Sequence, residues 1–182
     1  MAYINDTGLP SVTDIIRPYI NSDWYTEESQ ERGTAVHAAC AAYLLKLYAP
    51  PVKPEWKGYV DSFKRWAESV IEDVILVEKR LIDEKLAFCG KPDMIVKLKG
   101  DKRLSLPDIK TGQATLRAWQ IQSAAYRHLA RVNGIETSRG FPVRLKEDGS
   151  GTLPIIDYSK NIQKDFNVFQ GLLNSYNYFH RG

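Results

Sequence analysis

The sequence is poor in cysteine, with only Cys40 and Cys89 among its 182 residues. Two thiols in one chain cannot build a framework of disulfides, a four-thiolate zinc site or a four-cysteine iron–sulfur cluster. Long apolar runs are also missing, since the stretch from Ala38 to Leu45 falls far short of the roughly 20 residues that span a bilayer. We therefore expect buried cysteines and a soluble protein with no membrane partner.

The amino terminus lacks the basic start and apolar run of a secretory signal, which predicts a reducing, cytoplasmic compartment. The chain also lacks a strong charge of either sign, because its formal net charge is only +3. Such a mild surplus suits an anionic partner, but many proteins that never bind nucleic acid share it. Charge alone therefore selects no function.

The sequence contains no internal repeat, no low-complexity tract and no long Gly/Ser linker. Its hydrophobic content of 43% is enough for one proper core. We expect a single domain over residues 1–182, with a core at about 31–158 and terminal helices packed on it.

Hydrophobic periodicity predicts helices first, then three strands, a helix, two strands and a last helix. Ser11 is the expected N-cap of a short opening helix. This order indicates an α/β fold, a central mixed β-sheet flanked by helices, rather than a bundle or barrel. The longer helices are expected at 31–48, 54–74, 115–132 and 162–176, and the strands at 74–82, 87–98, 104–110, 140–145 and 152–158.

Two acidic residues lie on neighbouring predicted strands. Asp93 lies near the start of one strand and Asp108 near the end of the next, so a hairpin between these strands would bring the carboxylates together. Lys110 follows Asp108 by two residues, which places both side chains on one face while Ile109 points into the core. Facing carboxylates suit a hard cation such as Mg²⁺ or Mn²⁺.

A cation held in this way lowers the pKa of a water molecule and stabilises charge on a phosphate. Lys110 could orient or deprotonate that water. It could equally act as a fixed positive charge in the transition state, and the spacing favours neither role.

Asp93 followed by Asp108-Ile109-Lys110 resembles the PD-(D/E)XK nuclease superfamily, in its RecB-like and phage-type exonuclease branch. The segment 32–37 resembles the upstream helical motif of that branch, and 122–126 resembles its Q-x-x-x-Y helix. Glu78 matches the acidic position on the first core strand. Together these signals, in the family's order, are far more specific than a D-x-K triplet.

The resemblance implies a restriction-endonuclease-like core and a metal-dependent DNA exonuclease, active in recombination, repair or replication in a bacterial or phage-infected cell. It implies Mg²⁺ or Mn²⁺ and, with two cysteines instead of four, no iron–sulfur cluster. The implied catalytic residues are Asp93, Asp108, Lys110 and Glu78, and the implied metal ligands are His37, Asp93, Asp108 and the carbonyl of Ile109.

The residues expected to hold DNA are Arg32, Arg117, Gln122 and Tyr126. Arg117 belongs to a basic helical stripe that could meet phosphates or face solvent. His37 could instead be a core histidine, and Glu78 could bind metal, support another ligand or form a surface ion pair.

Three other functions fit the same residues: a catalytically inactive nucleic-acid-binding domain of this fold, an endonuclease, and a hydrolase of another phosphate ester. A chain of this size leaves no room for accessory domains. Processivity would therefore need self-assembly or a partner protein.

Overall fold

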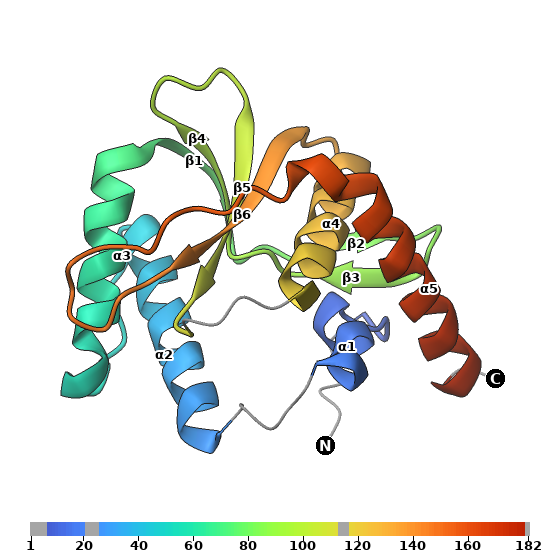
Figure 1. The fold of residues 1–182 in the computed structure, drawn as a ribbon, viewed down its shortest axis with the longest axis horizontal. Helices are drawn as coiled ribbons and strands as arrows, with labels where there is room; N and C mark the ends of the chain where they lie inside the picture. The colour runs from blue at the N-terminus through green and yellow to red at the C-terminus, as the bar shows by residue number, and fades with distance from the viewer. Residues whose placement is uncertain (1–6, 21–25, 113–116, 181–182) are drawn as a thin grey trace.

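The computed structural model describes residues 7–20, 26–112 and 117–180. It shows a central four-stranded sheet with helices on both faces (Figure 1). Helices α2 (Glu27–Leu44) and α3 (Lys57–Val70) lie on one side of the sheet. On the other side lie α1 (Val12–Ile16), α4 (Arg117–Val132) and α5 (Ile162–His180). The expected α/β class, a mixed sheet flanked by helices, is confirmed.

The strands of the central sheet follow the order β1-β4-β5-β6. They are β1 (Ile71–Val77), β4 (Met94–Leu98), β5 (Leu104–Lys110) and β6 (Thr137–Arg144). The β1–β4 and β4–β5 pairs are antiparallel, whereas β5 and β6 run parallel. A parallel pair needs a crossover connection, and α4 supplies it.

A second, two-stranded sheet pairs β2 (Leu81–Asp83) with β3 (Phe88–Gly90). Asp83 links it to α4, because its Oδ2 lies 2.7 Å from Nε2 of His128. Three short 3₁₀ turns complete the described elements, and they cover Arg17–Tyr19, Pro54–Trp56 and Ser159–Asn161.

The two middle strands of the central sheet, β4 and β5, are buried on both faces. Ile109, Met94 and Val143 pack with Phe63 in a cluster on the α2–α3 side. Leu106, Ile95, Leu129 and Phe169 belong to the cluster on the other side. Because β5 is covered on both faces, all its residues from Ser105 to Ile109 are buried, including the polar Ser105 and Asp108.

Local chemistry explains where two of the helices begin. Ser11 accepts a hydrogen bond from the Asp14 N–H, and Asp14 accepts one from Ser11, so that α1 starts with a capping box. Thr26 caps α2 in a similar way, which moves the start of this helix from the expected residue 31 to Glu27. Residues 115 and 116, the expected start of α4, lie outside the described residues.

The predicted strand 87–98 is wrong as one element. The structure divides it into β3 and β4, with Lys91, Pro92 and Asp93 between them. Pro92 has no N–H to donate to a strand ladder, so it favours a break at this point. The preceding strand also ends early, at Val77, because Glu78 adopts a positive φ of 50°. Residues 71–74 belong to β1 and not to the end of a helix.

The predicted hairpin of 140–145 with 152–158 is also wrong. Strand β6 starts at Thr137 and takes β5 as its parallel neighbour. Residues 152–158 contribute only an isolated bridge between Leu145 and Thr152. Pairing with the buried β5 is favoured because it buries both faces of β6, which a two-stranded hairpin cannot do.

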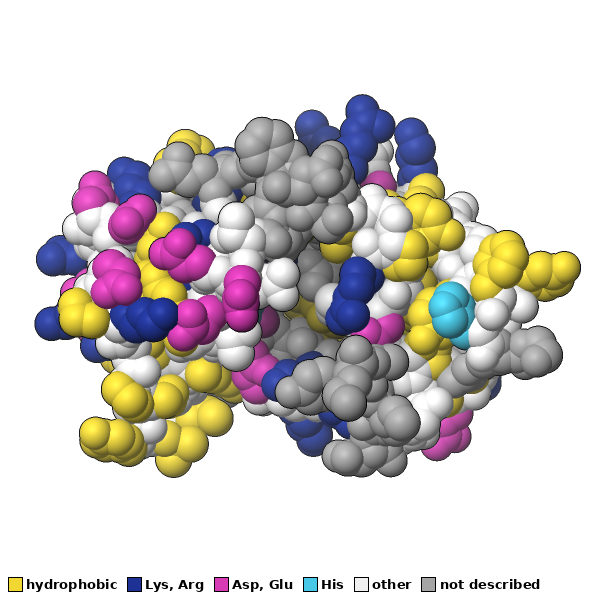
Figure 2. Space-filling view, turned by 90° about the horizontal axis from the view of Figure 1, so that it is seen from below, with side chains coloured by type: hydrophobic (Ala, Val, Ile, Leu, Met, Phe, Trp, Pro, Cys, Tyr) yellow, Lys and Arg dark blue, Asp and Glu magenta, His cyan; other side chains and the backbone are white. Residues whose placement is uncertain are grey.

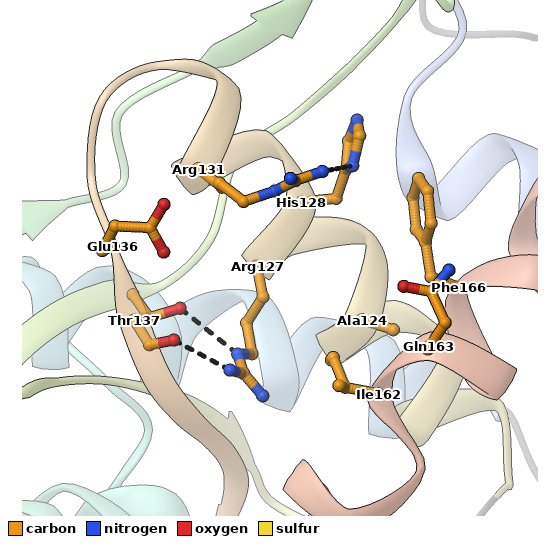
Figure 3. A pocket seen from close by; sticks show the side chains of 9 residues that line it. All are labelled: Ala124, Arg127, His128, Arg131, Glu136, Thr137, Ile162, Gln163 and Phe166. Carbon is orange, nitrogen blue, oxygen red and sulfur yellow. Dashed lines mark hydrogen bonds between the residues drawn. The ribbon is translucent and has the colours of Figure 1, made fainter.

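Arg127 on α4 contacts β6 in a pocket that is also lined by residues of α5 (Figure 3). Its guanidinium donates to the hydroxyl and the carbonyl oxygen of Thr137, at 3.2 and 2.8 Å. Beside it, the ring of His128 stacks on Phe166 with centroids 4.1 Å apart. We interpret these contacts as structural. Among the described residues, no helix combines the length and apolarity needed to cross a membrane.

Candidate metal centre and active site

Asp93 connects the ends of three strands. It lies in the break before β4, and its carbonyl oxygen accepts a hydrogen bond from the N–H of Glu78, just beyond β1. Its Oδ2 accepts one from the N–H of Ile109 in β5, with a nitrogen–oxygen distance of 2.6 Å. The carboxylate is therefore fixed by main-chain groups and has little freedom to turn away.

Three potential metal ligands meet at this point. Nδ1 of His37, on α2, lies 3.1 Å from Oδ1 of Asp93. His37, Glu78 and Asp93 each offer a ligand atom, and these atoms lie within 4.8 Å of one another. Two carboxylates and an imidazole can hold a divalent metal ion. In Figure 2 the molecule is hollowed between its two helical halves, and acidic side chains gather on the half to the left.

Asp108 and Lys110 emerge together from the end of β5, as the two-residue spacing predicts. Lys110 Nζ lies 2.6 Å from Asp108 Oδ2 and 3.0 Å from Oε1 of Gln122. Its charge also lies 5.3 Å from the ring centre of Trp119. Gln122 in turn approaches the hydroxyl of Tyr126, at 3.5 Å. Three contacts thus hold the ammonium group in place, two of them from α4.

Burial and charge act differently on the two aspartates. Burial by itself would raise the pKa of Asp93, but His37 and Lys110 outweigh it and hold this pKa below its usual value. Burial raises the pKa of Asp108, and the charge of Asp93 adds to the rise that Lys110 only partly offsets. Asp93 is the more readily ionised of the pair.

The charges of the two aspartates and Lys110 also change the pKa of His37. Burial alone would lower the pKa of its imidazole, but the charge and hydrogen bond of Asp93 raise it overall. The site therefore concentrates negative charge in a poorly solvated place, where a cation would relieve the repulsion.

Most of the predicted site residues come together. His37, Glu78 and Asp93 form one group, while Lys110 contacts Asp108 and Gln122, and Gln122 in turn approaches Tyr126. Two differences stand out. Glu78, rather than Asp108, completes the compact trio around Asp93, and Ile109 contacts Asp93 through its N–H. The metal role of Asp108 and of the Ile109 carbonyl stays a prediction.

Arg32 and Arg117 lie apart from these contacts in the described part of the chain. The guanidinium of Arg32 lies over the ring of Tyr59, 5.4 Å from its centre. Arg117 is the exposed first residue of α4. Their expected roles in DNA binding stay predictions.

Sequence reasoning missed three residues near the site. Lys91 Nζ lies 2.5 Å from Oε2 of Glu78. Its closeness to Asp93 in the sequence was a signal that could have found it. Arg144 pairs in register with Lys110, and Tyr158 lies within the electrostatic reach of Asp108. No local pattern indicates either of these, because both depend on the parallel β5–β6 pair.

Comparisons with known proteins support the fold. No family model matches this sequence, and no curated protein matches it. Among solved structures, the chain is similar to the crystal structure of a "putative exonuclease" from Eubacterium rectale, with a TM-score of 0.50. The similarity covers 92% of this chain and 82% of that one, at 12% sequence identity. At such low identity the likeness shows a common fold, and activity must be argued from the site.

Proposed function

We propose that this protein is a divalent-metal-dependent nuclease that hydrolyses phosphodiester bonds in DNA. The observation that carries this proposal is the meeting of His37, Glu78 and Asp93 beside the contact between Asp108 and Lys110. A metal ion held by this trio, next to a fixed ammonium group, would offer the two kinds of positive charge that phosphoryl chemistry uses.

The donor set fits Mg²⁺ or Mn²⁺, because it is rich in carboxylate oxygen and contains one imidazole. His37, Glu78 and Asp93 would hold the ion together with Asp108. When bound, the ion lowers the pKa of a coordinated water and neutralises charge that develops on the phosphate. The N–H groups of Ile109 and Glu78 keep Asp93 in position for this task.

Lys110 supplies the remaining charge. Asp108 and Gln122 hold its Nζ at 2.6 and 3.0 Å, so it is positioned before a substrate arrives. From this place it either orients the attacking water or stabilises the phosphate in the transition state. Attack by water leads to hydrolysis in one step, with no covalent bond between enzyme and substrate.

We favour an exonuclease over an endonuclease. Support comes from the resemblance of the motifs to the RecB-like branch and from the description of the structurally similar protein. The activity would serve end processing in recombination, repair or replication. In this proposal Arg32, Arg117 and Gln122 contact the DNA strand, and processivity comes from self-assembly or a partner protein. The predicted DNA contact of Tyr126 is not proposed again, because this side chain is buried and its hydroxyl faces Gln122.

The direct test is cleavage of end-labelled linear DNA with Mg²⁺, with Mn²⁺ and with a chelator. A covalently closed circle of the same sequence separates the two modes, because an exonuclease needs an end. Asp108→Asn and Lys110→Met should abolish cleavage in folded protein. Glu72→Gln is the control, since Glu72 is exposed and pairs with Lys97 at the surface.

Full activity in either site variant would refute these assignments. DNA binding in chelator, with no cleavage under any divalent ion, would instead identify an inactive nucleic-acid-binding domain. Hydrolysis of nucleotides but not of polymers would indicate another phosphate ester as substrate.

A further inference from the structure

Strand β6 carries an arginine into the neighbourhood of the candidate active site. The parallel register pairs Asp108 with Pro142 and Lys110 with Arg144. Paired residues on neighbouring strands point to the same face, and the strands lie about 4.8 Å apart. Arg144 therefore emerges beside Lys110, on the side away from β4 and Asp93.

The segment after β6 holds this arginine. Nη2 of Arg144 donates to the carbonyl oxygen of Pro154 at 2.9 Å, and the main-chain oxygen of Arg144 accepts from the Leu153 N–H at 2.9 Å. Arg144 is partly exposed, whereas Tyr158 is buried. The segment after β6 thus holds the guanidinium through Pro154, while the residue as a whole stays partly exposed.

Tyr158 shows that Arg144 and Asp108 share one region. Burial raises the pKa of Tyr158 to about 12, the charge of Asp108 adds to the rise, and Arg144 opposes it. The Tyr158 hydroxyl therefore lies within reach of both charges. Across the sheet the site runs from the carboxylates near β1 and β4, through Lys110 on β5, to the guanidinium on β6.

We propose that Arg144 binds a phosphate of the DNA strand next to the phosphate that is cleaved. A guanidinium presents its donors as a planar fork that matches two phosphate oxygens. The proposed metal ion and Lys110, which Asp108 and Gln122 already hold, serve the phosphate that is cleaved, so the neighbouring phosphate would be bound by a different cation. The inference rests on the proposed nuclease function and assigns a substrate contact to β6.

A purely structural role for Arg144, as a clamp on Pro154, makes a different prediction. Loss of a clamp lowers thermal stability but leaves the salt dependence of DNA binding unchanged. Loss of one phosphate contact reduces the slope of log K against log salt by about 0.9 for duplex DNA or about 0.7 for a single strand.

The test compares Arg144→Gln with Arg139→Gln on the same strand. Arg139 is partly exposed, like Arg144, but pairs with Asp101 at 3.7 Å. Binding of a 20-nucleotide duplex and of its single strand is measured in chelator over a range of salt. The KM and kcat for cleavage are measured separately with Mn²⁺.

We expect Arg144→Gln to weaken binding roughly tenfold or more, to reduce the salt slope by one contact and to raise KM more than it lowers kcat. Arg139→Gln should resemble the unchanged protein. Arg144→Lys keeps the charge but loses the fork, so it should retain the slope and bind several-fold more weakly. If the glutamine variant does not fold, the lysine variant decides.

An unchanged salt slope and KM in Arg144→Gln, or full affinity in Arg144→Lys, would overturn the assignment. The binding assay is independent of cleavage. A protein that binds DNA through Arg144 but never cuts it would therefore refute the nuclease function alone, whereas cleavage with no effect at Arg144 would refute this inference alone. A protein with no affinity for DNA would refute both.

Discussion

Replacement of Asp93 separates the charge of this residue from its hydrogen bonds. Its Oδ2 accepts from the Ile109 N–H at 2.6 Å, and its Oδ1 lies 3.1 Å from Nδ1 of His37. Asparagine has the same shape, so its oxygen can still accept from Ile109 and its NH₂ group can face His37. Alanine removes both contacts. The two variants should therefore differ in stability but agree in lost activity.

The magnitude follows from burial. The side chain of Asp93 is 11% exposed and Ile109 is 2% exposed, so Asp93→Ala leaves a buried N–H without its acceptor. An unsatisfied buried donor costs about 1–3 kcal/mol. For a chain of this length each kcal/mol lowers Tm by about 2–4 °C, which predicts a fall of roughly 2–12 °C for Asp93→Ala.

Asp93→Asn should unfold within about 1 kcal/mol of the unchanged protein. Asparagine keeps the hydrogen-bond acceptor for Ile109. The substitution removes the attraction of the Asp93 charge for His37 and Lys110, but it also removes the repulsion between Asp93 and Asp108, which raises the pKa of Asp108. Its nuclease rate should nevertheless fall at least a hundredfold, roughly the effect of losing one preorganised electrostatic contact.

The assay is thermal unfolding in chelator, followed by cleavage of end-labelled DNA with Mn²⁺. Glu72→Gln is again the control, because exposed ion pairs contribute about 0–1 kcal/mol. Equal destabilisation by alanine and asparagine would show that the hydrogen bond to Ile109 is not what Asp93 contributes to stability. Undiminished cleavage by Asp93→Asn would remove Asp93 from the metal site.

Lys91→Met removes an ammonium group that lies 2.5 Å from Glu78 and would compete with a metal ion for this carboxylate. Calorimetry should show several-fold tighter binding of Mn²⁺ to the variant, and weaker binding would count against such competition. Gly58→Ala places a Cβ against a main-chain carbonyl of the neighbouring loop, which should cost about 3 kcal/mol in denaturant unfolding. Gly171→Ala meets nothing and should be neutral or stabilising, and equal effects at the two helical glycines would refute the packing argument. Burial alone would raise the pKa of Asp83, but backbone hydrogen bonds and a neighbouring imidazole lower it, so its ionised form stabilises the fold. That stabilisation is present above the ordinary pKa near 3.8 and is lost as pH falls through the lowered pKa. Asp83→Asn should therefore flatten the acid side of a Tm-against-pH profile. An unchanged profile would contradict this role of Asp83.

Much of the fold follows from local patterns. The helical periods predict α2, α3, α4 and α5 within a few residues, because each helix has one face that must be buried. The alternation of β5 places Asp108 and Lys110 on one face, where the structure brings their charged atoms into contact. Capping chemistry and Pro92 decide element boundaries that the periodicity leaves open.

The sequence by itself therefore determined the fold class, the pairing of an acid with an amine on β5, and the residues from which a metal site could be built. Only the tertiary structure decided that Glu78 joins His37 and Asp93, and that β6 runs parallel to β5 and delivers Arg144 beside Lys110. The physical reason is the range of the interactions. Helical faces and strand alternation are set by near neighbours in the chain, whereas strand partners more than twenty residues apart are selected by the burial of whole faces.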